Sequence, residues 1–312
     1  MVIERARWRS HPKDAVFSEW TAPGGMKLRR MDWPRRKSRK ARGSLLFAGG
    51  RGDFIEKYLE AFAHWRDAGW NVTAFDWRGQ GGSRGDNVNA NVESFDVLID
   101  DLAALIGDVR AGAPGPHVAV AHSMGGHLLL RTVVERRPAL DAAVLVAPMI
   151  MVNSAPIPAW LAPDLADTMC RLGFRARPMW KTPVALTRPG SQRQRILTGS
   201  RERYEDELAW WEQAPEFNLG PPSWGWLCAA YRSAEEAFTA ERLAEVDLPI
   251  LILGTDRDRL VSAAAIRRVA AALPRAELEM VPGAAHEILR EADPVRAEAL
   301  ARIDAFLAGQ AP

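Results

Sequence analysis

Short apolar runs alternate along the chain with longer amphipathic stretches. Each run is hydrophobic at successive positions, which is typical of strands covered by helices on both faces of a parallel sheet. The predicted strands of this kind are Ser44–Ala48, Val72–Trp77, His117–Ala121, Ala142–Ala147 and Pro249–Leu253, and a final strand, Ala276–Val281, precedes the last helix. Helical spacing predicts helices over Ile55–Ala68, Ser94–Val109, Gly125–Arg136, Ala263–Leu273 and about Pro294–Leu307. An antiparallel hairpin, Ala15–Thr21 with Met26–Asp32, precedes them. We therefore expect an α/β fold with a mostly parallel, doubly wound central sheet.

The alternation of strands and helices fails between about Met149 and Ala240. This stretch is rich in proline and holds six of the twelve tryptophans, without a clear strand-like run. We interpret residues 149–240 as a helical cap inserted into a core made of residues 1–148 and 241–312. Because buried aromatic side chains are usually structural, we expect most of these tryptophans to pack a small core within the insertion.

The segment from His117 to Arg131 carries the strongest chemical signal. A buried strand runs into Ala121-His122-Ser123-Met124-Gly125, and a helix follows at once. Small residues two positions before and after Ser123 suit a nucleophile elbow, a tight strand-to-helix turn that exposes the serine hydroxyl. We predict that Ser123 is a nucleophile at the carboxyl edge of the sheet.

A serine hydroxyl needs a base to take its proton, and we assign this role to His286. It lies in a loop of small residues directly after the last predicted strand, at the same edge of the sheet. His122 adjoins Ser123, but neighbours on a strand point to opposite faces, so His122 is poorly placed as the base.

The acid of a serine triad is expected after the second-last strand, where the chain offers Asp256 and Asp258. We favour Asp258, because the run Asp-Arg-Leu-Val that begins with it resembles the usual sequence at the catalytic acid. Asp256 remains the alternative. The order Ser123, Asp258, His286 is that of α/β-hydrolases and differs from the orders in chymotrypsin and subtilisin.

A glycine-rich loop, Gly49-Gly50-Arg51-Gly52, follows the strand Ser44–Ala48. Such a loop lets the backbone approach a substrate closely. We predict an oxyanion hole formed by the backbone N–H groups of Arg51 and Met124. A nucleotide-binding interpretation fails, because Ile55 stands where the third glycine of the motif would be.

Composition narrows the possible partners and compartments. The chain is 47% hydrophobic and 26% charged, as in an ordinary globular protein, and its net charge is only +2. No signal peptide or membrane-spanning run is evident. The two cysteines, Cys170 and Cys228, match no metal-binding spacing, so we expect a cytoplasmic protein that needs no metal or organic cofactor.

Basic residues are concentrated between Arg29 and Arg42, where eight stand with one acidic residue. The rest of the chain is therefore net acidic, and nucleic acid is not an expected partner. We place this basic run in the loop between the second and third strands. Two interpretations remain: a solvated loop, or a peripheral contact with an anionic membrane.

These residues together resemble the α/β-hydrolases of the lysophospholipase and monoacylglycerol lipase group, also described as serine aminopeptidase S33. The resemblance includes the run Asp76–Ser83, similar to a D-x-R-G-x-G-x-S motif, and the pattern of Gly50, Gly52 and Asp53 followed by Lys57-Tyr58. Gly49 stands where the family has a histidine before this pattern. The resemblance implies a serine hydrolase that cleaves carboxylic esters of single-acyl lipids through an acyl-enzyme.

Three other functions stay open at this stage. The same triad would serve a short-chain carboxylesterase or an amidase of the aminopeptidase kind, which needs acidic groups for a free amine. The insertion offers such groups in one run, although we expect a solvated helix face there: Glu202, Glu205, Asp206 and Glu207. The third alternative is a catalytically silent binding module.

Overall fold

A computed structural model describes residues 7–85, 90–180 and 187–311. Eight strands form one sheet in the order β1-β2-β4-β3-β5-β6-β7-β8. Only β1 and β2 run antiparallel to their neighbours. The strands are β1 (Val16–Thr21), β2 (Lys27–Trp33), β3 (Gly43–Ala48), β4 (Trp70–Phe75), β5 (His117–His122), β6 (Ala142–Val146), β7 (Ile250–Gly254) and β8 (Ala276–Met280). The prediction of an α/β fold with a mostly parallel sheet is confirmed.

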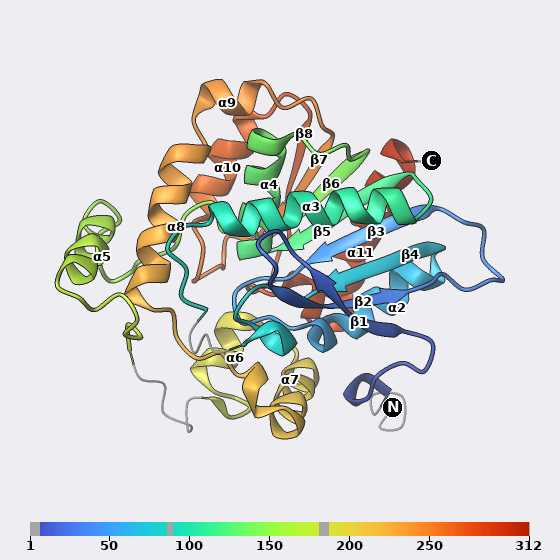
Figure 1. The fold of residues 1–312 in the computed structure, drawn as a ribbon, viewed down its shortest axis with the longest axis horizontal. Helices are drawn as coiled ribbons and strands as arrows, with labels where there is room; N and C mark the ends of the chain where they lie inside the picture. The colour runs from blue at the N-terminus through green and yellow to red at the C-terminus, as the bar shows by residue number, and fades with distance from the viewer. Residues whose placement is uncertain (1–6, 86–89, 181–186, 312) are drawn as a thin grey trace.

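Helices cover both faces of this sheet (Figure 1). One apolar cluster joins the sheet to α3 (Asp96–Gly112), α4 (Met124–Arg136) and α10 (Ala263–Ala272). A second cluster, on the other face, includes α2 (Leu59–Asp67) and α11 (Asp293–Gln310). Every residue of β3, β5, β6 and β7 except His117 is buried, which explains why these strands are apolar at successive positions.

Short 3-10 helices complete this core: η1 (Arg7–Arg9), η2 (Ile55–Tyr58), η3 (Gly81–Ser83) and η6 (Ile288–Arg290). None of the helices within the described ranges combines the length and the hydropathy that crossing a membrane requires.

The segment between β6 and β7 folds as helices. It contains α5 (Ala162–Arg171), α6 (Gln192–Leu197), α7 (Arg201–Gln213), η5 (Pro215–Phe217), α8 (Trp224–Ala237) and α9 (Ala240–Ala244). Helix α5 packs on α8 and lies far from α7 in Figure 1. Among the tryptophans of the segment between β6 and β7, Trp210 and Trp226 are buried, but Trp160 is 77% exposed and Trp180 is 51% exposed. The expected packing role therefore does not hold for these last two.

The expectation that the basic run from Arg29 to Arg42 lies in one loop is wrong for its first part. Its first part belongs to β2, because this strand pairs with β4 as far as Trp33. The Arg29 side chain forms ion pairs with the buried carboxylates of Glu56 and Asp76. Only residues 34–42 form a connection, which reaches the start of β4 where the Arg42 N–H donates to the Gly69 carbonyl at 3.0 Å. This connection lies at the amino ends of β3 and β4.

Candidate active site

Ser123 occupies the sharp turn between β5 and α4. Its backbone has φ of +53° and ψ of −116°, a strained conformation for a residue with a side chain. The Ser123 N–H donates to the Val146 carbonyl at 3.0 Å, while its own carbonyl accepts from the N–H groups of His127 and Met149. Backbone bonds on both sides therefore hold the turn and fix the direction of the hydroxyl.

Glycine is needed at two positions around this turn. A Cβ on Gly125 would lie 2.3 Å from the Ala48 carbonyl oxygen, so the first turn of α4 packs directly against the end of β3. A Cβ on Gly50 would lie 2.9 Å from the Ser123 Cβ. The backbone of the glycine-rich loop thus lies directly against Ser123. A backbone N–H must come this close to donate to an oxyanion formed at the serine.

His286 links Ser123 to Asp258 through hydrogen bonds. The Ser123 Oγ lies 2.9 Å from the His286 Nε2, and the His286 Nδ1 lies 2.7 Å from the Asp258 Oδ2. All three residues are buried although they come from three separate loops. The structure therefore brings the three predicted triad residues together.

The two aspartates after β7 have different surroundings. The other oxygen of Asp258, Oδ1, accepts from the N–H groups of Leu260 and Val261 at 2.8 and 3.0 Å. Asp256 points outward and pairs with Arg267 at 2.7 Å. Asp258, not Asp256, is thus the carboxylate next to His286.

The electrostatics of this pair suit a base held by an ionised acid. Burial by itself lowers the pKa of His286, but the Asp258 carboxylate outweighs burial and the pKa lies above its ordinary value. For Asp258, burial raises the pKa, while the charge and hydrogen bond of His286 bring it below the usual range. Asp258 therefore stays ionised, and its negative charge favours a proton on the neighbouring His286 ring.

Side chains from several elements hold the glycine-rich loop in place. The Trp77 Nε1 donates to the Gly49 carbonyl at 2.7 Å, and the Gly50 N–H donates to the Asp53 Oδ2 at 2.6 Å. The Gly52 N–H donates to the Gln80 Oε1. Trp77 and Gln80 belong to the run that resembles the family motif, so this motif anchors the loop where the family histidine is absent.

The two residues predicted to form an oxyanion hole are Arg51 in the glycine-rich loop and Met124 directly after Ser123. Met124 is the first residue of α4, at the positive end of the helix dipole. The Arg51 side chain reaches into the insertion, where its guanidinium donates to the carbonyls of Gly220 at 2.9 Å and Pro221 at 2.8 Å. The loop next to Ser123 is thus tied to the segment between β6 and β7.

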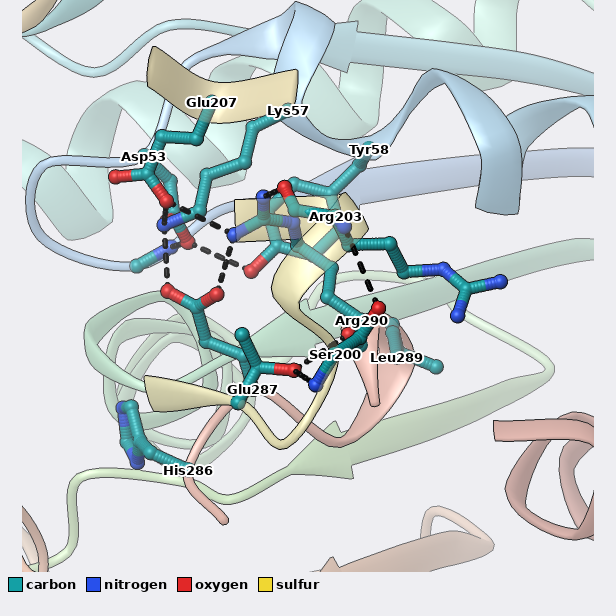
Figure 2. Close-up of polar contacts among 12 residues, drawn as sticks. Asp53, Lys57, Tyr58, Ser200, Arg203, Glu207, His286, Glu287, Leu289 and Arg290 are labelled. Carbon is teal, nitrogen blue, oxygen red and sulfur yellow. Dashed lines mark hydrogen bonds and ion pairs between the residues drawn. The ribbon is translucent and has the colours of Figure 1, made fainter. Parts of the chain in front are cut away.

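A buried ion cluster lies beside these loops and was not predicted (Figure 2). The Lys57 Nζ lies 2.7 Å from Asp53, 2.6 Å from Glu287 and 3.5 Å from Glu207. Burial by itself lowers the pKa of Lys57, but these carboxylates outweigh burial and raise it to about 12. Arg290 also pairs with Glu207 and Glu287. The cluster joins the glycine-rich loop, the loop that carries His286, and α7.

The four-residue spacing of Asp53 and Lys57 is the one signal of this cluster in the sequence, since a side chain just before a helix can reach one in its first turn. The partners on α7 and η6 come from far along the chain. Glu207 is fully buried, and Asp206 is buried and pairs with Arg9 at 2.7 Å. The expectation of a solvated helix face is wrong for these two residues.

Two other histidines near Ser123 have structural partners. The His122 Nδ1 lies 2.9 Å from both the Asp53 Oδ2 and the Tyr58 hydroxyl. His127 contacts the Met149 carbonyl and the Ser233 hydroxyl, and burial lowers its pKa to about 3. His127 is therefore neutral at ordinary pH and links α4 to α8. In the described part of the chain, no three His, Cys, Asp or Glu side chains are grouped as metal ligands would be.

Comparison with known proteins gives consistent family matches. The family model for serine aminopeptidase, S33, matches residues 39–293. Lysophospholipase L2 of Escherichia coli strain K12 is 29% identical over 280 residues, covering 82% of this chain and 78% of the relative. A monoacylglycerol lipase of Mycolicibacterium smegmatis is 23% identical over 253 residues, covering 80% and 83%.

Solved structures with the same fold cover nearly the whole chain. A soluble variant of monoglyceride lipase from Saccharomyces cerevisiae superposes with a TM-score of 0.77 at 16% identity, covering 97% of each chain. A carboxyl esterase from Bacillus coagulans gives a TM-score of 0.72 at 19% identity, covering 96% of this chain and 100% of the esterase. At these identities the likeness shows the α/β-hydrolase fold alone.

Proposed function

Because this chain belongs to the serine aminopeptidase S33 family of hydrolases, we propose that it cleaves carboxylic esters of single-acyl lipids with Ser123 as nucleophile. That it is a carboxylic ester hydrolase follows from its lysophospholipase and monoacylglycerol lipase relatives. The observation that carries the serine mechanism is the hydrogen-bond chain from Ser123 through His286 to Asp258. Lysophospholipids and monoacylglycerols are the proposed substrates.

In this mechanism Ser123 attacks the acyl carbonyl carbon while the His286 Nε2 takes the hydroxyl proton. The Asp258 carboxylate holds the ring in the tautomer with a proton on Nδ1 and stabilises the imidazolium. The negative charge that develops on the carbonyl oxygen is bound by the backbone N–H groups of Arg51 and Met124. His286 then protonates the departing alcohol, and an ester to Ser123 remains.

Water completes the cycle. His286 removes a proton from a water molecule that attacks the acyl-enzyme, and the fatty acid leaves as Ser123 regains its proton. No step requires a metal ion or an organic cofactor, because the nucleophile, the base and the oxyanion donors all come from the chain.

We also propose that residues 149–240 act as a cap that shapes the substrate site. Two contacts next to the triad support this role. The Arg51 guanidinium bonds to Gly220 and Pro221, and the His286 N–H donates to the Ile196 carbonyl at 3.3 Å. Because the cap touches both the oxyanion loop and the histidine loop, differences in its sequence would change which esters fit.

An aminopeptidase activity is less well supported, because the four acidic residues of α7 that could hold a free amine already have partners. Glu207 pairs with Arg193 and Arg290, and Glu205 pairs with Arg201. Burial raises the pKa of Glu207, but Arg193, Lys57 and Arg290 together outweigh burial and lower the pKa to about 2. A free amine would have to displace an arginine to bind there.

The test is acid release by the wild type and by Ser123→Ala. The substrates are lysophosphatidylcholine, monoacylglycerols of several lengths, short p-nitrophenyl esters and aminoacyl p-nitroanilides. We expect lipid turnover that the substitution lowers by about 10⁶-fold, as in serine hydrolases that lose the nucleophile. Turnover of short esters alone would replace the lipid assignment. If no substrate were hydrolysed and a fluorophosphonate did not label Ser123, the result would indicate a catalytically silent binding module.

A further inference from the structure

A cavity of about 260 Å³ lies beside the histidine loop, between α6 and the loops that follow β7 and β8. This volume is below the roughly 300–1,000 Å³ of sites that hold drug-sized ligands, so it suits a small group and not a whole lipid. Six residues line it: Gln192, Arg195, Ile196, Arg257, Arg259 and Ala285. Half of the lining residues are therefore arginines.

These arginines are not neutralised by the protein. Within residues 7–85, 90–180 and 187–311, no ion pair joins Arg195, Arg257 or Arg259 to a carboxylate. Arg195 donates to the Gly190 carbonyl at 2.6 Å, and Arg257 donates to the Gly283 carbonyl at 3.2 Å. Asp256, the acidic residue next to Arg257, is already bound by Arg267. Three uncompensated guanidinium groups around one cavity favour an anion, above all a phosphate, which guanidinium groups bind in a bidentate manner.

Three residues that line the cavity are sequence neighbours of two triad residues. Arg257 and Arg259 flank Asp258 in the chain, and Ala285 precedes His286. Helix α6 is fixed to this loop, because the His286 N–H donates to the Ile196 carbonyl at 3.3 Å. In the proposed mechanism His286 protonates the departing alcohol, so the headgroup of the substrate leaves on the side of His286.

From this placement we propose that the arginine-lined cavity binds the phosphate of the leaving headgroup, and that the enzyme prefers phosphate-bearing single-acyl lipids to monoacylglycerols. This inference rests on the proposed function and deepens it, since it assigns the headgroup class. A monoacylglycerol has no group that would use the three positive charges. A 1-acyl lysophospholipid carries one phosphate, four bonds from the glycerol carbon that bears its ester.

The test compares 1-oleoyl-lysophosphatidylglycerol with 1-oleoylglycerol, which share the acyl chain and the ester. The variants are Arg195→Gln, Arg259→Gln and the double variant. Because a hydrogen bond to a charged group contributes about 1.5–3 kcal/mol, we expect each substitution to lower the ratio of kcat/KM for the phospholipid to that for the monoacylglycerol by about 10- to 100-fold. The ratio reports recognition of the phosphate, because a general loss of activity cancels.

The control is Arg201→Gln, which removes the same charge from α7. The Arg201 side chain is 70% exposed and pairs with Glu205 at the surface, so the ratio should stay within about twofold of the wild type. Arg195→Gln is the decisive single variant, since Arg195 lies on α6 and not beside Asp258. If Arg259→Gln lowered the kcat/KM ratio and Arg195→Gln did not, the effect would come from a shift of the loop that carries Asp258. This result would overturn the proposal.

A second arm separates a lipid headgroup from free phosphate. Inorganic phosphate and glycerol 3-phosphate should compete with the lysophospholipid in the wild type and more weakly in Arg195→Gln. If inorganic phosphate instead changes the hydrolysis of 1-oleoylglycerol, and the substrate ratio is the same in all variants, the cavity binds a free anion and the headgroup assignment is wrong.

The two proposals fail in different ways. If the wild type hydrolyses neither lipid, the proposed function fails. If it hydrolyses both in a manner that depends on Ser123, and the arginine variants keep the wild-type ratio, only the headgroup assignment is overturned. Thermal unfolding of each variant shows whether the fold is intact.

Discussion

Asp256 and Asp258 have the same side chain and lie two residues apart, yet their surroundings give them different chemistry. Asp258 is buried and bonded to His286 and to two backbone N–H groups, whereas Asp256 is exposed beside Arg267. We predict that Asp258→Asn lowers kcat about 10⁴-fold, because an amide stabilises the wrong tautomer of the histidine. Asp256→Asn loses one surface ion pair and should change kcat less than twofold. A large loss of kcat in Asp256→Asn would reverse the assignment.

The charge on His286 also predicts how activity depends on pH. The base must be neutral to take the serine proton, so kcat/KM falls as the pH falls through the pKa of His286 in the free enzyme. Burial lowers this pKa, but Asp258, with smaller contributions from Glu287 and Asp53, raises it above the ordinary 6.5. We expect the acid limb of the kcat/KM profile to have its midpoint above 6.5. A midpoint below 6.5, in a protein that remains folded over the same range, would contradict this electrostatic description.

At the scale of elements, the cluster around Lys57 connects η2 with α7 and η6. Removing one partner of a buried salt bridge strongly destabilises the folded state, because the remaining charge stays buried without compensation. Lys57→Met leaves Asp53 and Glu287 without their shared cation. We expect it to lower the free energy of unfolding by about 3–5 kcal/mol, measured by urea denaturation.

The matched control is Arg36→Gln, which breaks the ion pair of Arg36 with Asp67 at the surface. Both partners there are exposed, so the expected loss is at most about 1 kcal/mol. If the two variants lost the same free energy of unfolding, the buried cluster would contribute no more than a surface pair.

Whether an element could be predicted from the sequence depends on how far along the chain the residues lie that it contacts. The strands and the turn at Ser123 could be predicted, because their signals lie within the segment itself. These signals are the hydrophobic pattern of each strand, the small residues on both sides of Ser123, and the helix that follows the strand directly. The role of α7 could not be predicted, since two of the cations that pair with Glu207 are Lys57 on η2 and Arg290 on η6, both more than eighty positions away in the chain. For the same reason the sequence does not reveal the ion pairs of Arg29, although it predicts the strand Met26–Asp32: the partner Asp76 follows β4, more than forty positions along the chain.

At the scale of the whole molecule, the basic connection and the active site lie at opposite edges of the sheet. Residues 34–42 lead into the amino end of β3, whereas Ser123 follows the carboxyl end of β5, which is parallel to β3. In Figure 1 this connection projects from the right side of the molecule, away from α5 and α6. A membrane bound at this edge would therefore not cover the entrance to the site.

This separation makes the proposed membrane contact testable apart from catalysis. Neutralising Arg35, Arg36, Lys37, Arg39 and Lys40 to glutamine removes five charges, each of which contributes about 1 kcal/mol near an anionic surface. We expect binding to vesicles of anionic phospholipid to fall by at least about 100-fold in a sedimentation assay. Hydrolysis of dispersed lipid below its micellar concentration should keep its wild-type kcat/KM, because the loop does not touch Ser123 or its partners. Equal vesicle binding by the two proteins would mean that residues 34–42 are only a solvated connection.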